Sequence, residues 1–157
     1  MSYRIAKTLW VPRPIDAVFE FFGNAANLEL MTPPWLAFKI LTPQPIEMCP
    51  GTHIDYRISL RGLPMRWRSE ITTWKPPFEF VDEQRKGPYR QWHHRHTFES
   101  RDGGTLVGDE VTYDVLGGDL IHRLFVAGDL RKIFAFREET MLRLFRDDSR
   151  LPNDQGA

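Results

Sequence analysis

The chain has 157 residues, of which 41% are hydrophobic and 27% are charged, so we expect one globular domain and exclude a disordered chain. Its 21 basic and 21 acidic residues balance, which argues against a nucleic-acid-binding protein. No apolar run approaches the roughly 20 residues of a membrane-spanning helix, residues 1–10 lack the apolar core of a secretion signal, and the lone Cys49 excludes an internal disulfide. We therefore expect a cytoplasmic protein without an integral membrane segment.

The first part of the chain predicts a strand and two helices. Residues 4–11 alternate weakly between apolar and polar side chains, as an amphipathic strand does. Apolar residues at helical spacing then predict a helix that begins at Pro14 and ends at Gly23. A second, short helix is expected to run to about Met31, with Asn24 as its N-terminal cap.

From Trp35 onward the apolar residues recur with a period of two, which predicts a run of strands. We expect these strands at residues 35–41, 53–60, 65–71, 78–84, 89–100 and 105–115. Between the last two, Asp102-Gly103-Gly104 is a strong signal for a β-hairpin turn.

After Gly117-Gly118 the chain is predicted to form one long helix over residues 120–147. Its apolar residues fall at steps of three, four and seven, which gives one amphipathic face: Val126, Leu130, Ile133, Phe134, Met141, Leu144 and Phe145. Residues 1–149 then form a single domain, and the polar residues 150–157 are expected to be a disordered tail.

The predicted order is β-α-α, six strands and a final helix, which indicates an α+β fold. Consecutive strands joined by short turns form an antiparallel sheet, and the long C-terminal helix can cover one of its faces. We therefore expect a curved seven-stranded antiparallel sheet wrapped around the helix. A cavity between the sheet and the helix would be the place for a small ligand.

This order and several phrases of the sequence resemble a known family. The phrases are Leu30–Leu36, Gly51–Tyr56, Phe80–Gln84 and, most distinctive, Gly87–Phe98. Over residues 3–147 the chain resembles the START-like, or SRPBCC, superfamily of helix-grip folds, which includes pollen-allergen-like ligand carriers and polyketide cyclases. It is most similar to a bacterial branch described as cyclase/dehydrase-like. The resemblance implies a ligand-binding pocket but does not imply a particular reaction.

The last hairpin is predicted to bring histidines and a carboxylate together on the inner face of the sheet. His94 and His96 share the inward parity of one strand, and Asp109 has the inward parity of the next. A turn at Asp102-Gly103 pairs His96 with Asp109, whereas a turn at Gly103-Gly104 leaves them diagonal. Both registers keep the two inward faces matched.

Three interpretations of His96 and Asp109 remain open at this stage. The pair can be structural and fix the register of the hairpin, it can contact a ligand, or it can act as a catalytic acid and base. In each case we expect the charge of Asp109 to raise the pKa of His96 above its ordinary value of about 6.5.

The three neighbouring histidines do not by themselves predict a metal site, because strand alternation turns His93 away from His94 and His96. The two inward histidines and Asp109 would together supply three ligands. Hydrogen-bonded pocket histidines are far commoner, so we expect no metal and no cofactor.

Ligand contacts are expected from inward-facing strand residues and from the first part of the long helix. These residues are Tyr56, Trp67, Phe80, Gln84, Trp92, His94, His96, Asp109, Tyr113, Phe125, Leu130 and Phe134. Asp82 is expected at the solvated rim of the cavity.

The sequence favours a protein that binds a hydrophobic or amphipathic small molecule in this cavity. One alternative is a polyketide cyclase/dehydratase-type enzyme that uses His96 and Asp109. Another alternative is an interaction domain whose own side chains fill the core. The sequence leaves the oligomeric state open.

Overall fold

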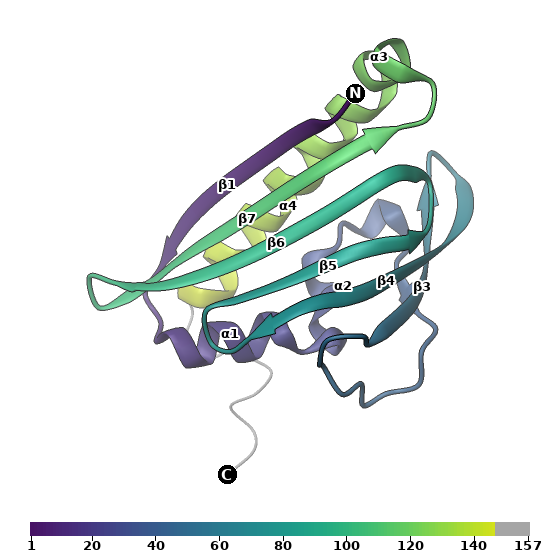
Figure 1. Ribbon diagram of the computed structural model, residues 1–157. Coiled ribbons are helices and arrows are strands. Elements are labelled where there is room, and N and C mark those ends of the chain that lie inside the picture. The colour runs from purple at the N-terminus through teal and green to yellow at the C-terminus, as the bar shows by residue number, and fades with distance from the viewer. Residues whose placement is uncertain (147–157) are drawn as a thin grey trace.

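A computed structural model describes residues 1–146 of the chain. The expected disordered tail at 150–157, and the expected end of the domain at 149, lie outside these residues. Across the described part of the chain, seven antiparallel strands form one sheet in the order β1-β7-β6-β5-β4-β3-β2 (Figure 1). The strands are β1 (Tyr3–Val11), β2 (Lys39–Ile40), β3 (His53–Leu60), β4 (Leu63–Lys75), β5 (Glu79–Lys86), β6 (Tyr89–Arg101) and β7 (Gly104–Val115). The predicted seven-stranded antiparallel sheet is therefore confirmed, and with the long helix described next it forms the expected α+β helix-grip fold.

Short helices precede the strands, and a long helix follows them. The early ones are α1 (Ile15–Gly23), η1 (Ala25–Asn27), α2 (Leu28–Met31) and η2 (Pro34–Leu36). The late ones are α3 (Gly118–Ile121), the π-helical η3 (His122–Val126) and α4 (Ala127–Arg146). In Figure 1, α4 runs along one face of the sheet, beneath β7 and β6. No helix among residues 1–146 is both long and apolar enough to cross a lipid bilayer.

The β6–β7 hairpin decides which residues face one another on the inner surface of the sheet. Asp102 and Gly103 both have positive φ, at 51° and 77°, so they form the two-residue turn. Arg101 therefore pairs with Gly104, and His96 lies directly opposite Asp109. The sequence allowed two registers, and the structure has the one that a turn at Asp102-Gly103 produces.

The strand predicted at 35–41 is largely wrong. Residues Pro34–Leu36 form a turn of 3₁₀ helix, and Ala37 has a left-handed conformation with φ 46°. Pro33 and Pro34 fix φ values that suit the start of such a turn and cannot donate to a sheet ladder. What remains is the two-residue strand β2, which pairs with Arg57 and Tyr56 of β3.

Two apolar clusters hold α4 against the sheet at different points along its length. One surrounds Phe145, which is 1% exposed and packs edge-on against Phe21 at a centroid distance of 5.3 Å. The other surrounds Leu130 and Phe134, which pack against the inner face of β7. The helix is thereby fixed against the sheet toward both of its ends.

Because Phe145 is fully buried, Phe145→Ala should lower the free energy of unfolding by about 3–5 kcal/mol. The control is Leu120→Ala, at a position 67% exposed, which should change it by less than about 0.5 kcal/mol. Urea unfolding of both variants measures the difference. Equal effects would show that the end of α4 does not belong to the core.

Candidate functional site

A cavity of about 170 Å³ lies between the inner face of the sheet and the helices that cover it. Strands β3 to β6 supply one wall, and α4 together with the segment from α1 to η2 supplies the other. Its lining is mainly aromatic and aliphatic, and its polar groups include Asp82, His94, His96 and Arg137. The cavity therefore combines apolar walls with a charged cluster.

The structure places eight of the twelve residues expected to contact a ligand in the wall of this cavity. They are Tyr56, Trp67, Phe80, Trp92, His94, His96, Leu130 and Phe134. Within this wall, Trp67 stacks on Tyr56 at a centroid distance of 5.8 Å and meets Trp92 edge-on at 5.3 Å. The lining thus includes flat aromatic surface next to the polar groups.

The other four expected residues lie outside the cavity lining and have different partners. The Gln84 amide donates to the backbone carbonyl of Tyr89 at 2.7 Å, so it fixes the β5–β6 turn. The Tyr113 hydroxyl bonds to the His122 ring at 2.8 Å.

Phe125 and Asp109 are the remaining two of these four. Phe125 is 44% exposed and lies under the guanidinium of Arg61, 5.1 Å from its ring centre. It therefore faces outward, because the π-helical turn of η3 departs from the 3.6-residue period that predicted it inward. Asp109 lies away from the cavity surface, where its Oδ1 contacts His94 Nε2 and lies 3.9 Å from His96 Nδ1.

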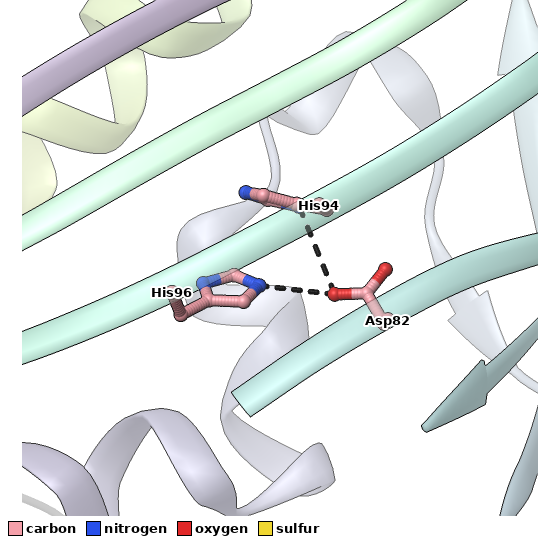
Figure 2. Close-up of side chains that lie close together, drawn as sticks. All are labelled: Asp82, His94 and His96. Atoms are coloured by element: carbon pink, nitrogen blue, oxygen red, sulfur yellow. Dashed lines mark hydrogen bonds and ion pairs between the residues drawn. The ribbon is translucent and has the colours of Figure 1, made fainter. Parts of the chain in front are cut away.

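Five polar residues from four elements form one connected network, here called the His-Asp network: Asp82 (β5), His94 and His96 (β6), Asp109 (β7) and Arg137 (α4). The His94 Nε2 contacts Asp109 Oδ1, and the Arg137 Nε donates to Asp109 Oδ2 at 2.9 Å. The His96 Nε2 bonds to Asp82 Oδ2 at 3.0 Å, and His94 Nδ1 is 3.8 Å from the same oxygen. Figure 2 shows His96 pointing a ring nitrogen at Asp82, and dashed lines join both imidazoles to the same Asp82 oxygen.

The pairing in this network is diagonal. His96 lies opposite Asp109 in the sheet, and His94 lies opposite Asp82, yet each histidine bonds to the carboxylate opposite the other. The two imidazoles lie against each other, with ring centres 3.9 Å apart. The predicted proximity of a histidine and Asp109 is therefore present, but the bonded histidine is His94 and not His96.

Both carboxylates in the network are held in the ionised form. Burial alone would raise the pKa of Asp109, but the charge of Arg137 and then the contact with His94 hold it well below its usual range. Burial also opposes ionisation of Asp82, and the hydrogen bond from His96 and the nearby His94 outweigh it and lower the pKa. The network therefore contains two negatively charged carboxylates, Asp82 and Asp109, and one permanently positive side chain, Arg137.

The expectation that the pKa of His96 is raised is wrong. Burial and the proximity of His94 lower it to about 4, and the attraction of Asp82 and Asp109 does not compensate. A neutral imidazole is therefore present at pH 7. Since this folded-state value lies below the unfolded value of about 6.5, the contribution of His96 to stability falls as the pH drops from about 6.5 toward 4.

Two members of the network differ from what the sequence predicted. Asp82 is 19% exposed and bonded within the network, not on a solvated rim, because β5 continues to Lys86 beyond it. Arg137 was not identified at all. Its position between Phe134 and Met141 at steps of three and four puts a charged side chain on the apolar stripe of the helix, and this was the available signal.

The family model described as "Polyketide cyclase / dehydrase and lipid transport" matches residues 11–136. The chain belongs to this family. No curated protein sequence matches the chain significantly.

Solved structures share the fold of this family member at low sequence identity. The Zhui aromatase/cyclase from Streptomyces sp. R1128 is 13% identical with a TM-score of 0.72, over 98% of this chain and 99% of that one. Ara h 8.0201 is 16% identical with a TM-score of 0.59, over 90% and 98%. A nucleoside-diphosphate sugar epimerase from Corynebacterium glutamicum is 20% identical with a TM-score of 0.65, over 90% of this chain and 29% of that one. These likenesses establish the START-like helix-grip fold.

Removing one partner of the Arg137–Asp109 pair should leave an uncompensated buried charge. We expect Arg137→Leu to lower the free energy of unfolding at pH 7 by about 3–5 kcal/mol, and the double variant Arg137→Leu/Asp109→Asn to lose less than the single variant. Urea unfolding measures each. Arg131→Leu, at an exposed position of the same helix, is the matched control, and an equal loss there would contradict the account.

Proposed function

We propose that this protein binds a small hydrophobic or amphipathic molecule in the cavity between the sheet and α4. The observation that carries the proposal is a space of about 170 Å³ with aromatic walls and polar groups converging on one side. Sites for small organic ligands commonly combine an apolar lining with a few placed polar groups. The polar groups would orient a ligand whose apolar part lies against the aromatic rings.

The volume supports a ligand of modest size. A dry cavity of about 150 Å³ is large enough to take up benzene, so the space here suits a molecule with one aromatic ring and a polar substituent. The same volume counts against an interaction domain with a completely filled core. A larger polycyclic ligand would require the walls to move apart.

A one-ring amphipathic quencher tests this proposal directly. We expect 4-nitrobenzyl alcohol to quench tryptophan fluorescence saturably, through contact with Trp67 and Trp92 in the cavity wall. The saturable part should disappear in the variant Trp67→Phe/Trp92→Phe and persist in Trp10→Phe, since the Trp10 ring bonds to Arg101 away from the cavity.

A variant that fills the cavity provides the control for specific binding. Ala25→Leu adds bulk to a buried wall position, so calorimetry should show at least tenfold weaker binding of the same probe. Ala135→Leu makes the same change at an exposed position of α4 and should leave the affinity unchanged. Non-saturable quenching, or equal affinities in the two variants, would contradict the proposal.

A second candidate function is a cyclase/dehydratase-type reaction, favoured by the presence of His96 and Asp82 in the cavity wall. Proton transfers by such groups contribute about 10²–10⁴-fold to a rate. A synthetic poly-β-ketone thioester is the substrate to test, with aromatic product followed by absorbance. We expect His96→Gln to lower the rate by about 100-fold or more and the outward-facing His93→Gln to leave it unchanged. No product above the uncatalysed rate would eliminate this candidate.

A further inference from the structure

We propose that Asp82, His94 and His96 form a binding site for a divalent transition-metal ion in the wall of the cavity. The proposal goes beyond the binding of an apolar ligand and does not depend on it. Two imidazoles and one carboxylate are a ligand set suited to Zn²⁺ and to neighbouring first-row ions. The three residues come from the adjacent strands β5 and β6, so the sheet itself holds them in place.

The first argument is the convergence of the three ligand atoms. The His96 Nε2 is 3.0 Å from Asp82 Oδ2, His94 Nδ1 is 3.8 Å from the same oxygen, and one ligand atom from each residue lies within 4.8 Å of the others. Ligand atoms that surround an ion at about 2.0–2.2 Å lie roughly 3–3.5 Å apart. The separation between His96 Nε2 and Asp82 Oδ2 already falls in this range, and the His94 ring must move closer for the three side chains to share an ion (Figure 2).

The second argument is the support behind the histidines. A histidine that binds a metal usually donates its other ring N–H to a carboxylate, which fixes its tautomer and orientation. Asp109 Oδ1 contacts His94 Nε2 and is 3.9 Å from His96 Nδ1. With a proton on Nε2 bonded to Asp109, the His94 lone pair is on Nδ1, the nitrogen that faces Asp82. Asp109 is in turn held by Arg137.

The third argument is charge and access. Asp82 and Asp109 carry two negative charges, Arg137 carries one positive charge, and the imidazoles add none when they bind as neutral ligands, so the cluster has an excess of one negative charge. A divalent cation would reverse this excess. Because all three ligands line the cavity, the remaining coordination positions face the space where a small molecule would lie. Water or a ligand oxygen could complete the coordination shell there.

The structure changes the ligand set that strand alternation suggested. His93 has the opposite parity and lies on the outer face, opposite Glu83 and Thr112. The third ligand is Asp82 and not Asp109, which the sequence suggested. Asp109 instead supports the ring of His94. The alternative is a cluster that is held together by its own hydrogen bonds and binds no ion. The experiment must distinguish these two cases.

Metal binding is measured on the full chain after treatment with a chelator. We expect isothermal titration to show one Zn²⁺ per chain, and Co²⁺ to give visible d–d absorption without the thiolate charge-transfer band that coordination by Cys49 would add. His96→Gln and Asp82→Asn should each weaken Zn²⁺ binding by more than about 100-fold, and Asp109→Asn by about 10–100-fold. His93→Gln is the matched control and should bind as the wild type does.

A measurement on the unmodified protein covers the case in which a variant fails to fold. In long-range ¹H–¹⁵N spectra, Zn²⁺ should shift His94 Nδ1 and His96 Nε2 and leave the rings of His53 and His93 unchanged. Shifts at the outward histidines instead, or no uptake of Zn²⁺ or Co²⁺ by the wild type, would overturn the proposal. Binding of the nitrobenzyl probe is tested in chelator-treated protein, so failure of either proposal is distinguishable from failure of the other.

Discussion

The buried ion pair between Arg137 of α4 and Asp109 of β7 is the interaction on which the rest of the site depends. Its hydrogen bond joins the long helix to β7, the second strand of the sheet, and both side chains are about nine-tenths buried or more. A carboxylate in such surroundings is stable only with a partner, and Arg137 supplies it. Asp109 can then hold His94, and His94 with His96 directs the network toward the cavity.

Two apolar clusters flank the position from which α4 contributes Arg137 to this network. One cluster around Phe145 and another around Leu130 and Phe134 fix α4 at two points along its length. Between them the helix presents Arg137 to the sheet, where a purely apolar stripe would place another side chain of the core. Arg137 therefore belongs both to the charged network and to the wall of the cavity.

Much of the architecture was predictable from the sequence, because it follows from local rules. Period-two alternation predicts the strands from His53 onward, and the Asp102-Gly103 turn fixes which residues oppose one another on β6 and β7. The region from Trp35 to Leu41 was mispredicted because alternation alone cannot distinguish a short strand from a 3₁₀ turn that two prolines initiate.

The contacts within the site were less predictable, since they depend on side-chain direction across several elements. Register places His96 opposite Asp109, but the rings reach diagonally, so His94 takes Asp109 and His96 takes Asp82. The distance of Arg137 from β7 along the chain hides its partner, because no local rule links residue 137 to residue 109. The pKa of His96 depends on the balance of burial against two carboxylates, which only the three-dimensional arrangement determines.

The central claim is that an amphipathic small molecule binds between the aromatic wall and the His-Asp network. Its most direct test is a titration of the isotope-labelled protein with benzyl alcohol, followed through the side-chain resonances of the histidines. The account predicts saturable shifts at His94 and His96, which line the cavity, and none at His53 and His93, which lie outside it. Equal shifts at these four of the five histidines, or none that saturate, would contradict it.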